Sequence, residues 1–120
     1  MKNRVAVVDD DISVRESLPE LLKAWGLSAQ GFSSAQEFLA SQLVNETDCV
    51  ILDIAMPGMS GPDLQLELLR RRHRIPIVFI TAQRNERLRP RLLAGGAVEC
   101  LFKPFSEKAL RDAVNTALAS

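Results

Sequence analysis

Acidic side chains follow two apolar segments of the sequence, at the point where each segment ends. Asp9, Asp10 and Asp11 come directly after the first segment, and Asp53 closes the second. If the segments are neighbouring parallel strands, at least three carboxylates converge at one edge of a sheet. Like charges crowded in this way raise one another's pKa, and they are unfavourable unless a positive charge lies among them. The pattern therefore predicts a site for a divalent cation.

Mg²⁺ suits this site, because it is usually held by a few carboxylate and carbonyl oxygens together with retained waters. Thr81 and Lys103 end two later apolar segments. With the metal bound, the Lys103 ammonium and the Thr81 hydroxyl would hold the remaining oxygens of a phosphoryl group. Transfer of that group depends mainly on positioning and charge neutralisation. Asp53 would then be the nucleophile and form an acyl phosphate.

A structural role is the better explanation of each of these residues when it is taken alone. The aspartate triplet could cap a helix, Asp53 and Thr81 could end strands, and Lys103 could be a surface cation. Those separate roles leave unexplained why every strand that ends near one point of the sheet ends in a polar residue. The combination therefore favours a single site.

The elements that must position these residues alternate along the chain. Short apolar runs alternate with segments of helical period, which is typical of an α/β domain with a parallel sheet. Five strands are expected, at about 4–9, 28–32, 48–53, 75–81 and 98–103. Five helices are also expected: three at about 12–25, 61–73 and 89–95, and two that begin at Ser34 and at Ser106. Right-handed crossovers favour a doubly wound, flavodoxin-like sheet in the order 2-1-3-4-5.

Local signals support several of these helices. Ser34 and Glu37 have the spacing of a capping box. The helix at 61–73 is expected to bury Leu64, Leu68 and Leu69 on one face.

Length and composition limit the alternatives. A chain of 120 residues with 47% hydrophobic content is the size of one domain, spanning 1–120. No segment is long and apolar enough for a membrane span or a signal peptide, so we expect a cytoplasmic protein that does not contact membranes. Two cysteines without metal-ligand spacing are expected to be buried free thiols.

The formal charge is zero, but it is unevenly distributed. Residues 1–60 carry 4 basic and 9 acidic side chains, and residues 61–120 carry 11 and 6. Eight arginines lie between Arg70 and Arg91, which raises the alternative of nucleic-acid binding. The neutral total and the lack of interleaved aromatic residues favour solvated helix faces instead.

The chain resembles a bacterial response-regulator receiver domain, which has the CheY-like form of this fold. The matching segments are Val8-Asp9-Asp10, Asp53-Ile54-Ala55-Met56-Pro57-Gly58-Met59-Ser60-Gly61, Thr81-Ala82 and Lys103-Pro104-Phe105. A further segment, Phe32-Ser33-Ser34-Ala35-Gln36-Glu37-Phe38-Leu39, resembles the FixJ-type branch, whose members usually carry a C-terminal helix-turn-helix. The matches occur in order and cover the chain from end to end.

The resemblance implies a phosphorylation-dependent signalling switch of a two-component system. Asp53 would accept a phosphoryl group from a partner sensor histidine kinase. Asp10 would bind Mg²⁺ directly, Asp9 directly or through water, and the Ala55 carbonyl would be a third protein ligand. Thr81 and Lys103 would hold the phosphoryl group, and the peptide bond after Lys103 would be cis.

The same resemblance implies that the domain is not an enzyme, beyond self-phosphorylation from small donors and self-dephosphorylation. Phosphorylation would change an output face formed by the fourth helix with the fifth strand and helix, and could drive homodimerisation. Transcription regulation would require DNA binding by a C-terminal output domain absent from this chain.

One position departs from the family pattern. Receiver domains usually carry an aromatic residue three positions before the lysine, and here that position is Cys100. Phe102 lies on the same strand face as Cys100 and could take over part of the packing role. Arg84 is expected to be drawn toward a phosphoryl group on Asp53.

Two other classes of protein remain as alternatives. A Mg²⁺-dependent phosphatase or phosphotransferase would need a second aspartate two positions after the nucleophile, and Ala55 stands there. A flavodoxin-like cofactor binder would need a phosphate-binding loop after the first strand, where the aspartate triplet would repel phosphate.

Overall fold

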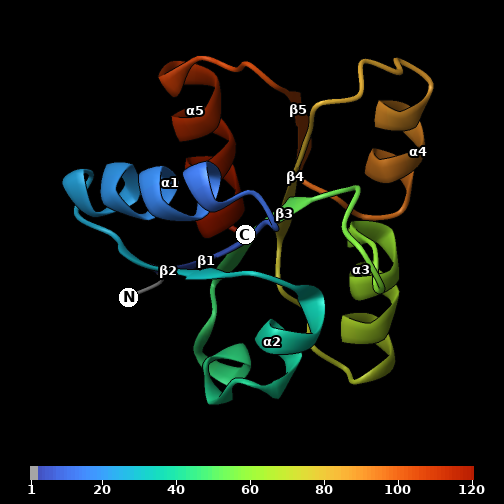
Figure 1. The fold of residues 1–120 in the computed structure, drawn as a ribbon, viewed down its shortest axis with the longest axis horizontal. Coiled ribbons are helices and arrows are strands. Elements are labelled where there is room, and N and C mark those ends of the chain that lie inside the picture. The colour runs from blue at the N-terminus through green and yellow to red at the C-terminus, as the bar shows by residue number, and fades with distance from the viewer. Residues whose placement is uncertain (1–2) are drawn as a thin grey trace.

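Five strands form one parallel sheet in the order β2-β1-β3-β4-β5 in the computed structural model, which describes residues 3–120 (Figure 1). Every pairing between neighbouring strands is parallel. The strands are β1 (Arg4–Val8), β2 (Ser28–Phe32), β3 (Cys49–Asp53), β4 (Ile77–Thr81) and β5 (Glu99–Phe102). The predicted doubly wound sheet and its strand order are confirmed, although some predicted strand ends were one or two residues too long.

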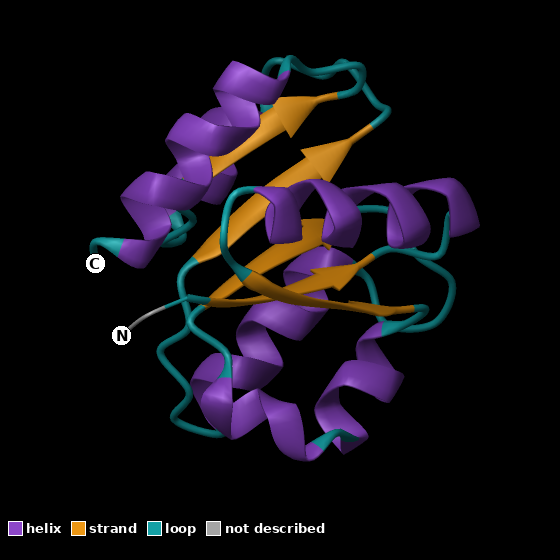
Figure 2. Cartoon of the chain, turned by 90° about the vertical axis from the view of Figure 1, so that its left-hand side faces the viewer, coloured by secondary structure: helices purple, strands orange, loops and turns teal. Residues whose placement is uncertain are grey.

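Helices cover both faces of the sheet, as Figure 2 shows from the side. They are α1 (Ile12–Ala24), α2 (Ala35–Ala40), α3 (Gly61–Arg70), α4 (Leu88–Ala94) and α5 (Glu107–Leu118). α1 and α5 pack on one face, and α2, α3 and α4 pack on the other. A 3-10 helix over Gln42–Glu46 was not predicted. The Ser41 hydroxyl caps it by accepting a hydrogen bond from the Leu43 amide.

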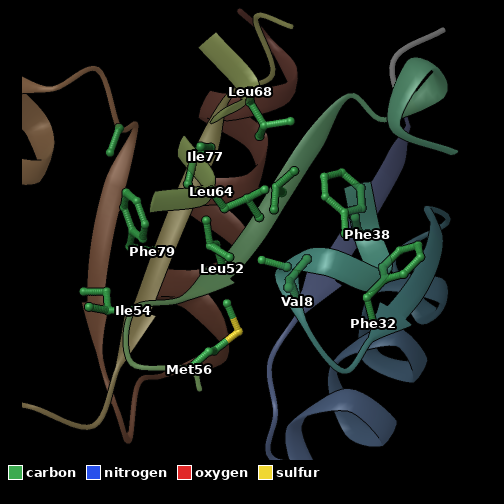
Figure 3. Close-up of a cluster of buried hydrophobic side chains, with 14 of the residues drawn as sticks. Val8, Phe32, Phe38, Leu52, Ile54, Met56, Leu64, Leu68, Ile77 and Phe79 are labelled. Atoms are coloured by element: carbon green, nitrogen blue, oxygen red, sulfur yellow. The ribbon is translucent and has the colours of Figure 1, made fainter. Parts of the chain in front are cut away.

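The core consists of two apolar clusters separated by the sheet. Alternate residues of each strand point to opposite faces, so β1 contributes Val5 and Val7 to one cluster and Ala6 and Val8 to the other. Figure 3 shows the cluster on the side of α2, α3 and α4. All residues of β3 and β4 are buried, as expected for central strands covered on both faces. The two cysteines are buried free thiols, as predicted.

Hydrogen bonds at the helix starts differ in part from the prediction. The Ser34 hydroxyl accepts from the Glu37 amide at 3.0 Å, so the predicted cap of α2 is confirmed. The Glu37 carboxylate, however, accepts from the amide and hydroxyl of Ser33. The predicted reciprocal bond to Ser34 is therefore wrong. A complete capping box, which was not predicted, joins Ser60 and Asp63 at the start of α3.

The end of α3 is a Schellman motif, in which two amides bond back to carbonyls of the last turn. The Arg72 amide donates to the Leu69 carbonyl at 3.0 Å, and the His73 amide donates to the Leu68 carbonyl at 2.8 Å. Arg72 has a φ of 64°, so α3 ends earlier than the predicted 61–73. Leu69 is 53% exposed, and its predicted burial is wrong. The core-facing stripe contains Leu64 and Leu68, and the residue after Leu68 is rotated away from it.

Replacing Arg72 by glycine is expected to stabilise the protein by about 1 kcal/mol, because a left-handed backbone costs a residue with a Cβ about that much. Urea denaturation of Arg72→Gly and wild type measures the change. Arg70→Gly is the matched control: Arg70 lies within α3 with helical backbone, so its replacement should destabilise. A lower free energy of unfolding for Arg72→Gly would contradict the prediction.

Gly61 allows the start of α3 to lie against the end of β3. A Cβ added there would be 2.5 Å from the carbonyl oxygen of Asp53 and 3.0 Å from the Cα of Ile54. These atoms belong to the backbone and cannot rotate away. We expect Gly61→Ala to destabilise the fold by roughly 2 kcal/mol, measured by thermal unfolding. Gly95→Ala is the control, since its added Cβ would meet no atom within 3.4 Å; equal losses from both variants would refute the steric argument.

Candidate functional site

Polar side chains from four strands meet at the carboxyl edge of the sheet. Asp9 and Asp10 follow β1, Asp53 ends β3, Thr81 ends β4, and Lys103 follows β5. One carboxylate oxygen from each of the three aspartates lies within 4.8 Å of the others. β1 and β3 are neighbours in the sheet, and this adjacency brings the first two aspartates next to Asp53.

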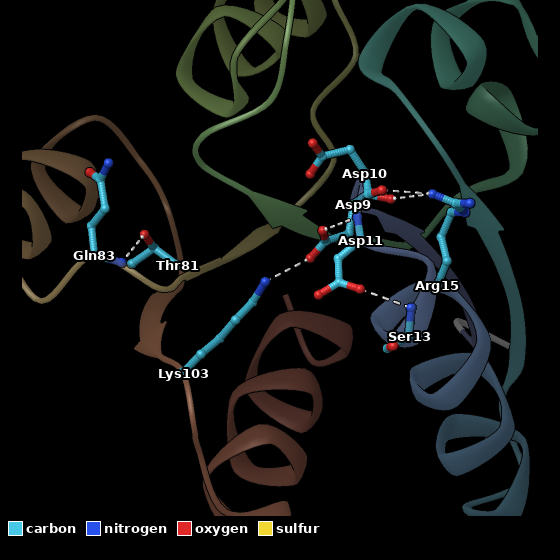
Figure 4. A network of polar contacts seen from close by, with 8 residues as sticks. All are labelled: Asp9, Asp10, Asp11, Ser13, Arg15, Thr81, Gln83 and Lys103. Atoms are coloured by element: carbon cyan, nitrogen blue, oxygen red, sulfur yellow. Dashed lines mark hydrogen bonds and ion pairs between the residues drawn. The ribbon is translucent and has the colours of Figure 1, made fainter.

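Lys103 supplies positive charge inside this acidic cluster. Its Nζ lies 3.0 Å from Oδ2 of Asp9, whose side chain is fully buried (Figure 4). The other oxygen of Asp9 accepts a hydrogen bond from the Asp11 amide at 2.9 Å. The Lys103 amide donates to the Thr81 carbonyl at 2.8 Å, and the Lys103–Pro104 peptide is cis, as expected. The lysine is therefore anchored at its backbone and paired at its ammonium.

The Asp53 carboxyl has a raised pKa of about 6, compared with an ordinary value of 3.8. Burial is the largest cause, and the charge of Asp9 adds to it. Lys103 acts in the opposite direction, and Asp10 raises the pKa further through its charge and a hydrogen bond. The Asp53 side chain is only 7% exposed. The site therefore holds more negative charge than Lys103 alone compensates.

Arg15 supports the loop that carries the aspartates, and the sequence analysis missed it. Its Nη1 donates to the carbonyl oxygens of Asp9 at 3.2 Å and Asp10 at 3.1 Å (Figure 4). Asp11 lies outside the cluster and caps α1 by accepting from the Ser13 amide at 2.9 Å. A basic residue one turn after an aspartate-rich helix start was the available signal. Its contact with backbone carbonyls could not be read from spacing.

The two remaining predicted residues are Thr81, at the end of the strand next to β3, and Ala55, two positions after Asp53. Thr81 is buried, and its hydroxyl accepts a hydrogen bond from the Gln83 amide at 3.0 Å. Ala55 is exposed in the loop after β3. The three-carboxylate cluster consists of hard oxygen donors, as Mg²⁺ prefers, and contains no histidine or thiol that would favour a transition metal. The donor chemistry therefore fits Mg²⁺.

Cys100 occupies the position where an aromatic side chain was expected from the resemblance. It is buried in the cluster that includes Phe79. Phe102 is half-buried, belongs to neither core cluster, and lines a surface hollow of about 640 Å³ between α4 and the start of α5. Arg89 and Glu99 form an ion pair of 2.7 Å beside that hollow and join α4 to β5. Cys100 lines the same hollow, so a partial packing role of Phe102 beside Cys100 stays a prediction.

Removing the Lys103 ammonium should destabilise the protein. Lys103→Ala would leave the buried Asp9 carboxylate without its cation, next to two other carboxylates. We expect a loss on the order of 2 kcal/mol in EDTA, measured by chemical denaturation, and a partial recovery when Mg²⁺ is added. Lys108→Ala is the control, because Lys108 pairs with Asp112 on an exposed face of α5. A Lys103→Ala variant as stable as this control would contradict the argument.

No helix within residues 3–120 has the length and apolar character required to cross a membrane.

Comparison with known proteins gives consistent results. A family model described as the response regulator receiver domain matches residues 5–115. Nodulation protein W of Bradyrhizobium diazoefficiens is 46% identical over 110 residues, which cover 92% of this chain and 48% of that protein. Transcriptional regulatory protein TdiR of Thauera aromatica is 40% identical over 115 residues, covering 96% and 51%. The chain thus spans about half the length of these curated relatives.

Solved structures show the same fold. The response regulator StyR superposes with a TM-score of 0.90 at 44% identity, covering 99% of this chain and 60% of StyR. The structure titled FixJ-N has a TM-score of 0.87 at 29% identity, covering 99% and 95%. The chain therefore belongs to the response-regulator receiver domains, which signal by phosphorylation in two-component systems.

Proposed function

We propose that Asp53 accepts a phosphoryl group from a partner sensor histidine kinase, and that this modification changes the affinity of an output face. The observation that carries the proposal is the convergence of Asp9, Asp10 and Asp53 within 4.8 Å, with Lys103 bonded to Asp9. Such a cluster combines a nucleophile with the positive charge that an incoming phosphoryl group requires.

The residues have separate roles in this proposal. Asp9, Asp10, Asp53 and the Ala55 carbonyl would hold Mg²⁺, and the bound ion would neutralise charge on the phosphoryl oxygens. An Asp53 oxygen forms a bond to phosphorus while the bond from phosphorus to the kinase imidazole breaks. With a pKa of about 6, Asp53 is mostly ionised at neutral pH and needs no general base.

Thr81 and Lys103 bind the remaining phosphoryl oxygens. The Thr81 hydroxyl accepts from the Gln83 amide, so its own proton is free to be donated to the new group. The Lys103 ammonium has further donors beyond the one it gives to Asp9. Moving the Thr81 hydroxyl toward the phosphoryl oxygens would pull on the loop after β4, which leads into α4.

The output face comprises α4, β5 and α5, where the hollow beside Phe102 and the Arg89–Glu99 pair lie. Phosphorylation shifts an existing equilibrium of this face rather than creating a new fold. Homodimerisation through the face is one consequence, and DNA binding belongs to a C-terminal output domain. A cytoplasmic location completes the proposal.

Uptake of a phosphoryl group from acetyl phosphate tests the proposal, with intact mass as the measurement. Wild type should gain one group in the presence of Mg²⁺ and Asp53→Asn none. Modification of a different residue, or of Asp53→Asn, would overturn it.

A further inference from the structure

The C-terminal end of α3 exposes apolar side chains at the edge of the sheet opposite to Asp53. Leu66 is 66% exposed and Leu69 is 53% exposed. They are two of the three large hydrophobic residues that are exposed within residues 3–120. Because they are three positions apart on one helix, they lie on the same side of α3.

A hollow of about 270 Å³ lies next to Leu69, where α3 ends and β4 and β5 begin. Its apolar lining residues are Leu68, Leu69, Ile75, Pro76, Ile77 and Val98. Leu68 and Ile77 form the adjoining end of the core cluster in Figure 3. A second hollow is lined by Leu69, Arg72 and Arg74. Leu69 therefore stands between two depressions that an apolar side chain could enter.

Arginine side chains line these depressions: Arg74 lines both, and Arg72 lines the second. Arg70 and Arg71 share the carboxylate of Glu67, at 3.0 Å and 2.7 Å from their Nε atoms. Arg72 and Arg74, in contrast, have no ion-pair partner or side-chain hydrogen bond within residues 3–120. The one acidic side chain of the segment is thus already engaged, and at least two guanidinium groups remain available.

The backbone of Arg72 adopts a left-handed conformation that is unfavourable for a residue with a Cβ. Its φ of 64° lies in the region where glycine is favoured. A sequence that needed only to end α3 would be more stable with glycine. Arg72 instead places a positive charge next to Leu69, at a cost in backbone stability that glycine would avoid.

We propose that Leu66, Leu69, Arg72 and Arg74 form a docking surface for an acidic protein segment that carries apolar side chains. The leucines and the apolar hollow would receive its apolar residues, and the two arginines would pair with its carboxylates. Charge complementarity points to an acidic partner, and the exposed leucines favour a protein over a nucleic acid, whose backbone contacts are made by charged and polar groups. This surface lies away from Asp53, so the inference goes beyond the proposed function.

Nuclear magnetic resonance of the isotope-labelled chain tests the proposal. The probe is an acetylated and amidated peptide with leucine at each helical turn and glutamate at the other positions. We expect amide shifts confined to residues 66–76 and 95–98. In the double variant Arg72→Gly with Arg74→Gln, which lacks two rim charges, the dissociation constant for the peptide should rise about tenfold. It should rise by a similar factor in the single variant Leu69→Gln.

The variants separate binding from folding and from phosphorylation. Arg72→Gly is expected to stabilise the chain, and Arg74 makes no ion pair within residues 3–120, so weaker binding by the double variant cannot arise from unfolding. Arg84→Gln with Arg87→Gln, which removes two exposed arginines elsewhere, should bind the peptide normally. Asp53→Asn should also bind normally, so that failure of the phosphorylation proposal leaves this result unaffected.

Three outcomes would overturn the proposal. The first is the absence of shifts in residues 66–76. The second is a dissociation constant of the double variant at Arg72 and Arg74 equal to that of wild type. The third is binding of single-stranded oligothymidylate to the same residues while the glutamate peptide causes no shifts, which would assign the surface to nucleic acid. A peptide with lysine in place of glutamate should cause no shifts there.

Discussion

In the presence of acetyl phosphate and Mg²⁺, the wild-type chain is expected to gain one phosphoryl group, and Asp53→Asn none. The amide of the variant keeps the size of the side chain but lacks the anionic oxygen that would attack phosphorus under the proposed function. Asp10→Asn removes a candidate metal ligand and leaves Asp53 intact. We expect it to slow phosphorylation by roughly 10- to 100-fold, the effect typical of damage around a metal site.

Asp11→Asn is the matched control for both variants. It carries the same substitution in the same acidic triplet, but Asp11 caps α1 through Ser13 rather than joining the cluster. Asparagine caps helices about as well as aspartate does. Time-resolved intact mass measures all four proteins. Equal slowing by Asp10→Asn and Asp11→Asn would show that net charge, rather than a defined metal site, controls the reaction.

Asp53→Asn is also expected to be more stable than wild type at neutral pH in EDTA, by roughly 2 to 3 kcal/mol. Folding raises the pKa of Asp53 from 3.8 to about 6, mainly because the carboxyl is buried. The ionised side chain therefore destabilises the folded state. Below pH 3.8, protonation of Asp53 makes its full contribution to the free energy of unfolding of wild type. This contribution is lost as the pH rises through about 6.

The higher stability of Asp53→Asn relative to wild type should consequently disappear at low pH. Urea denaturation of both proteins across the pH range measures this difference in the free energy of unfolding. Addition of Mg²⁺ should stabilise wild type at neutral pH, because a ligand that binds only the folded state shifts the folding equilibrium. It should have little effect on Asp53→Asn, which lacks one of the three clustered carboxylates. Asp63→Asn, at the capping box of α3, is the control. A gain that stays constant with pH would contradict the assigned cause.

The arrangement of the site was predictable because it follows from strand order. Once apolar runs alternate with helical segments, the right-handed crossover rule leaves few topologies. Residues that end β1, β3, β4 and β5 must then lie at one edge. The same logic explains why Asp9, Asp53 and Lys103 could be placed together although they are far apart in sequence.

Other features depend on contacts that the residue pattern does not specify. Leu69 fits a helical stripe nearly as well as Leu68, and only the packing of α3 on the sheet decides between them. The left-handed backbone of Arg72 was hidden because glycine is the usual signal for that conformation. Arg15 bonds to carbonyl oxygens, which every residue possesses, so its partners could not be inferred from residue types.

The ion pair between Lys103 and Asp9 joins residues 94 positions apart. Nearly the whole domain must therefore emerge from the ribosome before the acidic cluster acquires its cation. Until β5 has been added beyond β4, a nascent chain contains Asp53 and its neighbouring aspartates but lacks the ammonium that pairs with Asp9. Under the proposed function, the ability to accept a phosphoryl group would therefore depend on completion of the sheet.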